Sequence, residues 1–233
     1  RHAHGMETRG VHEGAGVMDK LAQLRNSGIS VLNDAPVSSE MTIIVVGIAR
    51  SGTSMIAGAL DALGIFMGDK ADRAVFEDVT IANALEQHPA LLPDQIKKYN
   101  SRYAVWGFKR PAAFNYIDRY LHLFRNPRVI ITYRDPAAIA KRNEISMVTD
   151  FRQQLLASSQ YLVSLSKFVG GLEVPALVVS YEKALFAPET LIAELCRFVG
   201  VPVTSTMAQK ASATVSNGSE MYLKASQVRF DRF

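Results

Sequence analysis

Short runs of apolar and β-branched residues predict four buried strands along the chain. They lie at 43–46, 104–108, 128–133 and 176–180. Runs of this length are short for buried helices, and an uninterrupted apolar character is typical of parallel strands that are covered on both faces. The pattern therefore predicts a sheet that lies inside the domain rather than at its surface.

The segments between these runs carry apolar residues at helical spacing. Helices are predicted over 53–63, 137–145, 151–169 and 188–198, and glycines or prolines stand at several of their ends. Strands that alternate with helices are typical of a three-layer α/β domain, in which a parallel β-sheet is flanked by helices. In such a domain the ligand lies above the carboxyl ends of the strands.

Two segments outside this alternation are assigned by their composition. Residues 1–40 contain no aromatic residue and are rich in glycine, histidine and serine, so we expect a flexible N-terminal segment with one short helix over 18–25. The domain then covers 41–233. Within it, 65–103 has no strand-like run, and we expect helices and loops that lie over the sheet edge.

The first predicted strand runs into a short polar loop and then into a helix. Gly47 and Gly52 have the spacing of a P-loop, but Thr53 stands where a P-loop has its lysine. The cation is instead Arg50, inside the loop. A strand, a glycine loop and a helix present backbone N–H groups and the positive end of a helix to an anion. We therefore predict an anion site here, with an ordinary strand-to-helix turn as the alternative.

Charged residues follow the next two predicted strands. Lys109 and Arg110 come directly after the second strand, and Arg134 comes after the third. Asp135 is a favourable helix N-cap and Pro136 suits the first helical position, so Arg134 is expected beside a helix N-terminus, where a phosphate binds well. Lys109 and Arg110 are expected to point into the crevice above the sheet, with a solvated strand end as the alternative.

The loop resembles the 5′-phosphosulfate loop of the sulfotransferases, which use 3′-phosphoadenosine 5′-phosphosulfate (PAPS) as sulfuryl donor. Its residues are Arg50, Ser51, Gly52, Thr53 and Ser54. Further segments resemble the same family: Phe76-Glu77-Asp78, Trp106-Gly107-Phe108-Lys109-Arg110-Pro111, Arg134-Asp135-Pro136, and the block from Tyr181 to Pro202. The resemblance runs from Thr42 to Pro202 and implies a fold with a P-loop-like 5′-phosphosulfate-binding loop.

This resemblance implies a role for each cationic position. In the family the loop binds the 5′-phosphosulfate, so Arg50 and its neighbours are expected to bind that group. Lys109 corresponds to a lysine near the sulfuryl group, Arg134 to an arginine on the 3′-phosphate, and Tyr181 to a tyrosine near the adenine. A family serine that shares the 3′-phosphate is replaced here by Arg142, a cation that we expect to take over the contact.

The expected catalytic base differs from that of one branch of the family. Cytosolic sulfotransferases have a histidine two residues after the lysine, and Pro111 stands there in this chain. Several families place a carboxylate in the segment 65–103, where we also expect the acceptor to be selected. Glu77 is therefore the predicted base and Asp78 the alternative. The alternative is that Glu77 and Asp78 only begin a helix, where acidic side chains interact favourably with the helix dipole.

The C-terminal part lacks one family feature. Cytosolic sulfotransferases have an Arg-Lys-Gly-containing cofactor loop near their end, which is absent from 203–233. The turn at Ser216-Asn217-Gly218 is a possible partial substitute, and we assign it no role in the predicted site.

Composition limits the expected partners. The chain has 233 residues, of which 48% are hydrophobic and 21% charged, and its formal net charge is +4. This mild excess suits a small polyanionic ligand, and no dense basic stretch with interleaved aromatics indicates nucleic acid. The single cysteine, Cys196, excludes an internal disulfide and favours a reducing compartment, so we expect a cytoplasmic protein. No apolar run in the sequence approaches the length of a membrane span.

The combined interpretation is a sulfotransferase that moves a sulfuryl group from PAPS to a hydroxyl or amine of a small-molecule, carbohydrate or lipid acceptor, with no metal. One alternative is a P-loop kinase-like phosphotransferase in which Asp135 holds Mg²⁺. Another is a non-catalytic domain that binds a phosphonucleotide. The acceptor and the oligomeric state stay open.

Overall fold

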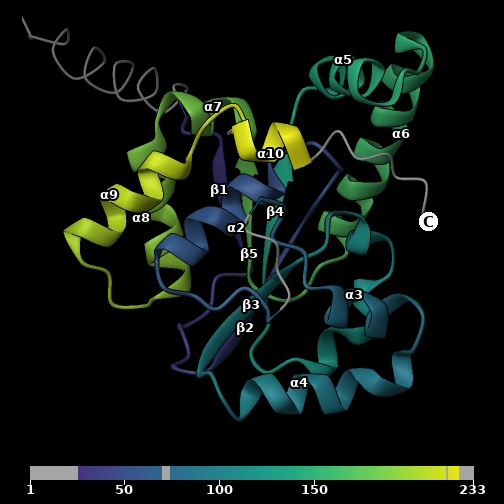
Figure 1. The fold of residues 1–233 in the computed structure, drawn as a ribbon. Coiled ribbons are helices and arrows are strands. Elements are labelled where there is room, and N and C mark those ends of the chain that lie inside the picture. The colour runs from purple at the N-terminus through teal and green to yellow at the C-terminus, as the bar shows by residue number, and fades with distance from the viewer. Residues whose placement is uncertain (1–25, 70–73, 219, 226–233) are drawn as a thin grey trace, which may run out of the picture.

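Five strands form one sheet in the order β1-β5-β4-β2-β3 (Figure 1). The structure is a computed structural model that describes residues 26–69, 74–218 and 220–225. The strands are β1 (Ile29–Leu32), β2 (Met41–Gly47), β3 (Val105–Lys109), β4 (Arg128–Tyr133) and β5 (Ala176–Ser180). The pairs β2–β3, β2–β4 and β4–β5 are parallel, whereas β1 pairs with β5 in the antiparallel sense. The predicted α/β class with a parallel sheet is confirmed.

Strand β2 shows why the apolar runs in the sequence are uninterrupted. All of its residues are buried. Its side chains alternate between two cores: Ile43 and Val45 belong to one, Ile44 and Val46 to the other. Because helices cover both faces of the sheet, no position along the strand is left for a solvated side chain. All four predicted strands are present close to their predicted bounds.

The edge strand β1 was not predicted from the sequence. It contributes only four half-buried or exposed residues, and it lies between Gly28 and Asn33, which have φ angles of 70° and 50°. Its backbone pairs Ile29 with Val179 and Leu32 with Ala176, so part of the segment assigned to a flexible N-terminus belongs to the sheet. The helix predicted over 18–25 lies outside the described residues, and the division of the chain at residue 41 stays a prediction.

Helices were correctly predicted in each of the four segments with helical spacing. The α-helices are α2 (Thr53–Ala62), α3 (Val79–Glu86), α4 (Leu92–Asn100), α5 (Pro136–Met147), α6 (Phe151–Gly170), α7 (Tyr181–Phe186), α8 (Pro188–Val199), α9 (Ser205–Thr214) and α10 (Glu220–Ala225). Short 3₁₀ helices are η1 (Pro89–Leu91), η2 (Pro111–Asn115) and η3 (Ile117–Leu123). None of the helices within the described ranges combines the length and the apolar character needed to cross a membrane.

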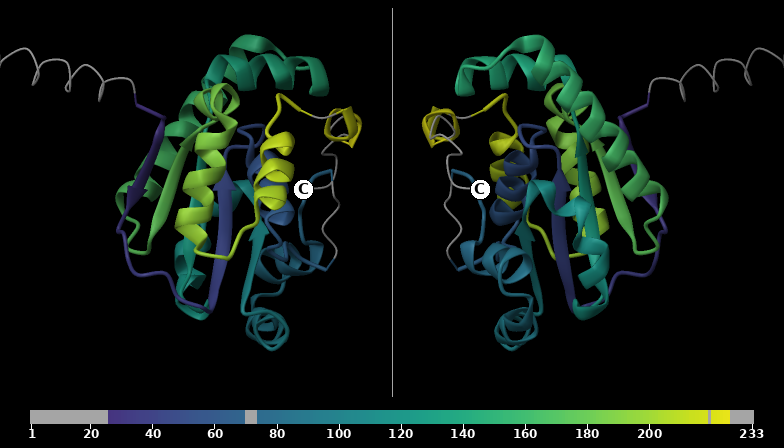
Figure 2. Two further views of the ribbon diagram at one scale, coloured as in Figure 1. Left: turned by 90° about the vertical axis from the view of Figure 1, so that its left-hand side faces the viewer. Right: turned by 90° about the vertical axis from the view of Figure 1, so that its right-hand side faces the viewer.

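The two helical layers meet the sheet through separate cores. Helices α2, α8 and α9 contribute to the core on one face, whereas α3, α4 and α6 contribute to the core on the other. In Figure 2, α5 lies beyond the carboxyl ends of the parallel strands and α4 lies toward the opposite end of the sheet. The β2–α2 loop, the end of β3 and the β4–α5 junction therefore lie together at the carboxyl ends of the parallel strands, as the sequence predicted.

Candidate active site

The β2–α2 loop turns through two residues in the left-handed region and packs tightly against its surroundings. Arg50 has a φ of 73° and Gly52 a φ of 96°. A Cβ added to Gly52 would lie only 2.3 Å from Cδ2 of Tyr181, so a side chain has no room there. The Ser51 Oγ lies 2.6 Å from the Oγ1 of Thr132 on β4, and Ser51 is fully buried. These contacts fix the loop against β4 and α7, and Arg50, Gly52 and Ser54 line the neighbouring cavity.

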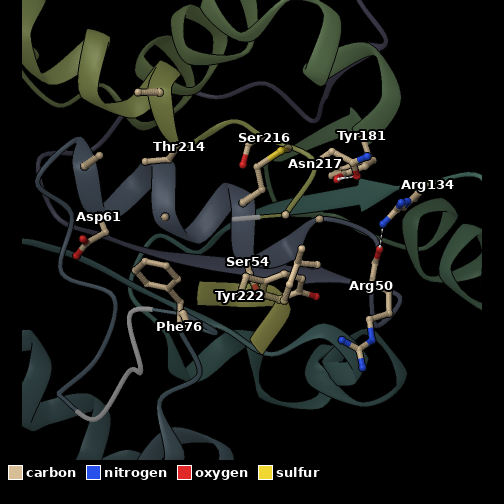
Figure 3. Close-up of a pocket in the computed structure, with 18 of the residues that line it drawn as sticks. Arg50, Ser54, Asp61, Phe76, Arg134, Tyr181, Thr214, Ser216, Asn217 and Tyr222 are labelled. Atoms are coloured by element: carbon tan, nitrogen blue, oxygen red, sulfur yellow. Dashed lines mark hydrogen bonds between the residues drawn. The ribbon is translucent and has the colours of Figure 1, made fainter. Parts of the chain in front are cut away.

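A cavity of about 470 Å³ lies beside this loop. Three arginines, Arg50, Arg134 and Arg142, line it together with the apolar atoms of Met55, Gly58 and Phe76. Figure 3 shows Arg50 and Arg134 together at one end and Asp61 and Phe76 toward the other. The cavity therefore has a cationic end at the loop, whereas its other part combines the apolar ring of Phe76 with the carboxylate of Asp61 on α2. The three arginines that the sequence assigned to phosphates line the same cavity.

Arg134 is held by the β2–α2 loop and by α7. Its Nη1 donates to the Arg50 carbonyl oxygen at 2.8 Å, and its guanidinium lies 4.4 Å from the ring centroid of Tyr181. Asp135 caps α5 by accepting a hydrogen bond from the Ala138 N–H at 2.9 Å, as predicted. The Nε of Arg134 makes no hydrogen bond within the described residues, but it lies 4.0 Å from Oε1 of Glu182, so the two side chains form a long ion pair. The Arg50 carbonyl and the Tyr181 ring therefore hold this guanidinium in place, with the Glu182 carboxylate beside its Nε.

Helix α5 brings further polar groups to the loop. Arg142 on α5 lines the cavity, and Ser146, one turn later, accepts a hydrogen bond from Arg50 Nη2 at 3.4 Å. In Figure 3 the Arg50 side chain extends away from Arg134, while the Arg50 carbonyl faces it. One residue thus supplies both a guanidinium and the acceptor that orients a second guanidinium.

Lys109 and Glu77, far apart in the sequence, form an ion pair beside the loop. The Lys109 Nζ lies 2.8 Å from Glu77 Oε1 and 3.3 Å from the Ser54 Oγ, which lines the cavity. Burial lowers the pKa of Lys109; Arg110 and Arg50 act in the same direction, and Glu77 opposes them. Only 2% of the Lys109 side chain is exposed, against 22% for Glu77. The pair is therefore next to the cationic end of the cavity, and Glu77 is its solvent-accessible member.

Asp78 has a structural use that Glu77 does not share. Its Oδ1 accepts from the backbone N–H groups of Thr80 and Ile81 at 2.8 and 3.1 Å, which caps α3. The Tyr99 hydroxyl donates to its Oδ2, and the residue is 2% exposed. Burial, with this hydrogen bond, raises the pKa of Tyr99. Both carboxylate oxygens of Asp78 are engaged in holding the start of α3.

The sequence profile of the sulfotransferase family matches residues 70–205, more than half of the chain. The chain belongs to the sulfotransferase family. Membership confirms the predicted resemblance and the class of enzyme, a transferase of the sulfuryl group. No curated protein is similar enough in sequence to be matched to the chain.

Solved structures of other sulfotransferases have a similar fold. A sulfotransferase from Alicyclobacillus acidocaldarius superposes with a TM-score of 0.51 at 16% identity, over 74% of this chain and 85% of that one. The sulfotransferase domain of the Synechococcus PCC 7002 olefin synthase gives a TM-score of 0.48 at 19% identity, over 75% and 78% of the two chains. At these identities the likeness to the Alicyclobacillus protein supports the sulfotransferase fold alone.

The C-terminal part of this sulfotransferase forms a wall of the cavity that the sequence did not predict. The Tyr181 hydroxyl donates to Asn217 Oδ1 at 3.0 Å, and Ser216, Asn217 and Gly218 all line the cavity, as does Tyr222 on α10. The turn at 216–218 was visible in the sequence, but its distance from the loop was not. Helix α9 brings it there by packing on α2 through the core that includes Ala211.

A second carboxylate, that of Glu86, shares the Arg110 guanidinium with Glu77. Its Oε1 and Oε2 accept from Nε and Nη2 of Arg110 at 2.6 Å each, and Tyr116 donates to Oε1 at 2.5 Å. Burial alone would raise the pKa of Glu86, but the hydrogen bonds from Arg110 and Tyr116 bring it below its ordinary value of 4.5.

Glu86→Gln is expected to lower the free energy of unfolding in a pH-dependent way. Because the folded-state pKa of Glu86 is depressed, its stabilisation is complete above 4.5 and is lost as the pH falls through the folded value. Urea unfolding across this range should show a difference between wild type and variant that shrinks in acid. Glu194→Gln, which breaks the more exposed pair with Arg197, is the control and should change the free energy of unfolding much less, because solvent screens an exposed ion pair. A wild-type-to-variant difference that does not vary with pH would contradict the expectation.

Proposed function

We propose that this sulfotransferase transfers the sulfuryl group of PAPS to a hydroxyl or amine of a small-molecule, carbohydrate or lipid acceptor. The observation that carries the proposal is the cavity beside the loop, which is lined by Arg50, Arg134 and Arg142. Such a site suits a nucleotide with two separated anionic groups. Because the chain has a single cysteine, Cys196, we propose the cytoplasm as its location.

The side chains present fit such a donor. The loop N–H groups and Arg50 bind the 5′-phosphosulfate, and Arg134 with Arg142 binds the 3′-phosphate. The position of Arg134 supports this assignment, because its guanidinium lines the cavity and a guanidinium makes charge-assisted hydrogen bonds to phosphate. Tyr181 borders the adenine. The expectation that no metal takes part stays a prediction.

The donor supplies an activated sulfuryl group, and the chain supplies charge and geometry. Lys109 places a positive charge beside Ser54, where it stabilises the negative charge that develops during transfer. Glu77 accepts the proton of the attacking hydroxyl or amine. The rigid loop orients the reacting groups, which lowers the entropic part of the barrier.

Label transfer from PAPS is the test of this proposal. Radiolabelled PAPS is incubated with the protein and a panel that contains nitrophenol, octanol, N-acetylglucosamine, cholesterol and benzylamine, without Mg²⁺. We expect labelled product from at least one class, with the desulfated nucleotide formed in equal amount. Binding of 3′-phosphoadenosine 5′-phosphate (PAP) without transfer to any class would favour a non-catalytic nucleotide-binding domain. Phosphate transfer from ATP with Mg²⁺ would favour a phosphotransferase.

A further inference from the structure

Arg110, at the end of β3, joins the two carboxylates that lie beside the loop. Its Nε and Nη2 donate to the two oxygens of Glu86, and its Nη1 donates to Glu77 Oε2, all at 2.6 Å. The backbone N–H of Arg110 donates to the Val45 carbonyl at 3.0 Å, which ties the residue to β2. Its side chain is 12% exposed. Arg110 is therefore a fixed connector between the sheet, Glu86 and Glu77.

The arrangement determines which oxygen of Glu77 faces which cation. Arg110 Nη1 donates to Glu77 Oε2, and Lys109 Nζ donates to Glu77 Oε1 at 2.8 Å. Glutamate has three side-chain torsions, and at 22% exposure neighbouring contacts must restrict them. A guanidinium can do this because its planar fork binds Glu86 with two parallel bonds and still has an N–H for Glu77. A lysine ammonium has no such fork.

The partners of Arg110 are themselves held in place. Tyr116 donates to Glu86 Oε1, and burial, with this hydrogen bond, raises the pKa of Tyr116, so the hydroxyl stays a donor. The chain of contacts runs from Tyr116 through Glu86 and Arg110 to Glu77 and Lys109. It contains two carboxylates and two cations, which leaves no net charge in a partly buried region.

We propose that Arg110, anchored by Glu86, is a positioning residue that holds the Glu77 carboxylate beside Lys109 for sulfuryl transfer. This inference rests on the proposed function, in which Glu77 is the base. Arg110 does not touch the reacting groups in this proposal and acts only through Glu77. Replacing Arg110 should therefore lower kcat only in a protein that still has Glu77.

A double-mutant cycle tests this dependence. Turnover is measured for Arg110→Gln, Glu77→Gln and the double variant with PAPS and the panel acceptor that wild type uses fastest. We expect Arg110→Gln to lower kcat by about 10²-fold, with the acceptor KM and the affinity for PAP unchanged. The double variant should be no slower than Glu77→Gln alone, because a residue that acts through another adds nothing once that other is gone.

Two further variants separate positioning from a general structural role. Glu86→Gln should lower kcat less than Arg110→Gln in the same direction, and it replaces Arg110→Gln in the cycle if that variant does not fold. The control is Arg197→Gln, which removes an arginine paired with Glu194 on α8 and should leave kcat unchanged. As a readout besides activity, NMR of isotope-labelled arginine should show slow exchange of the Arg110 Nε–H in wild type and faster exchange in Glu86→Gln.

Three results would overturn the inference, and they can be told apart from a failure of the proposed base. If the fold losses in kcat of Arg110→Gln and Glu77→Gln multiply in the double variant, Arg110 acts independently of Glu77. Rapid Nε–H exchange in wild type would show that Glu86 does not hold Arg110. A fall in PAP affinity equal to the fall in kcat would make Arg110 part of the nucleotide site. If Glu77→Gln instead keeps wild-type turnover, the base assignment itself fails, and the inference fails with it.

Discussion

Replacing Glu77 by glutamine is expected to lower kcat by about 10²–10⁴-fold while the affinity for PAP stays unchanged. Glutamine has nearly the shape of glutamate and keeps an oxygen for one of the cations, but its amide cannot take a proton from the acceptor. Glu77 contacts Lys109 and Arg110, whereas the arginines of the cavity come from other segments. Turnover and the PAP dissociation constant are measured on the same preparation.

Asp78→Asn is the matched control for this prediction. Asparagine also caps a helix well, so α3 should form and kcat should stay close to the wild-type value. Near-wild-type turnover in Glu77→Gln would remove Glu77 from the mechanism. A loss confined to Asp78→Asn would move the role of the base to Asp78, despite its use as an N-cap.

Arg134→Ala is expected to weaken PAP binding by about 1.5–3 kcal/mol. Charge-assisted hydrogen bonds to the 3′-phosphate are lost, and the Arg50 carbonyl loses its 2.8 Å donor. Titration calorimetry with PAP and with adenosine 5′-phosphate (AMP) measures the loss. AMP lacks the 3′-phosphate, so its affinity should fall less.

The companion variant Arg142→Ser restores the side chain that the family usually has at this position, and it should keep much of the PAP affinity. An equal loss of PAP and AMP affinity in Arg134→Ala, together with a lower melting temperature of the free protein, would give Arg134 a structural role instead. Such a result is physically reasonable, because its guanidinium also stacks on Tyr181.

The sheet could be predicted from the sequence because its strands are buried on both faces. Ile43 to Val46 alternate between two cores, so every position must be apolar, and the run is unmistakable. Strand β1 is an edge strand of four residues with exposed positions, and such a strand has no distinctive pattern. The antiparallel pairing with β5 decides its conformation, and this pairing is a long-range contact.

The parts of the site whose conformation depends on neighbouring residues in the sequence could be predicted. Gly47 and Gly52 are two positions of the loop at which a Cβ would clash with neighbouring atoms, and their spacing could be read directly from the sequence. By contrast, Glu77 and Asp78 are both acidic residues at a helix start, and only their partners distinguish the cap from the ion-paired carboxylate.

The contacts that were missed join the ends of elements that are far apart in the sequence. Glu86 ends α3 and Arg110 follows β3, so their contact depends on how α3 packs beside the sheet. The wall formed by Asn217 depends on how α9 packs on α2. Neither arrangement leaves a periodic or spacing signal in the sequence.

The measurement that tests the central claim most directly is the selectivity of nucleotide binding. PAP, AMP, ADP and ATP are titrated into the wild-type protein with and without Mg²⁺. Because Arg50 and the pair Arg134 and Arg142 provide for two separated phosphates, we predict that PAP binds at least about tenfold tighter than the other three, a difference of about 1.4 kcal/mol, and that Mg²⁺ does not change this. Equal affinities for PAP and AMP, or tight ATP binding that requires Mg²⁺, would contradict the account.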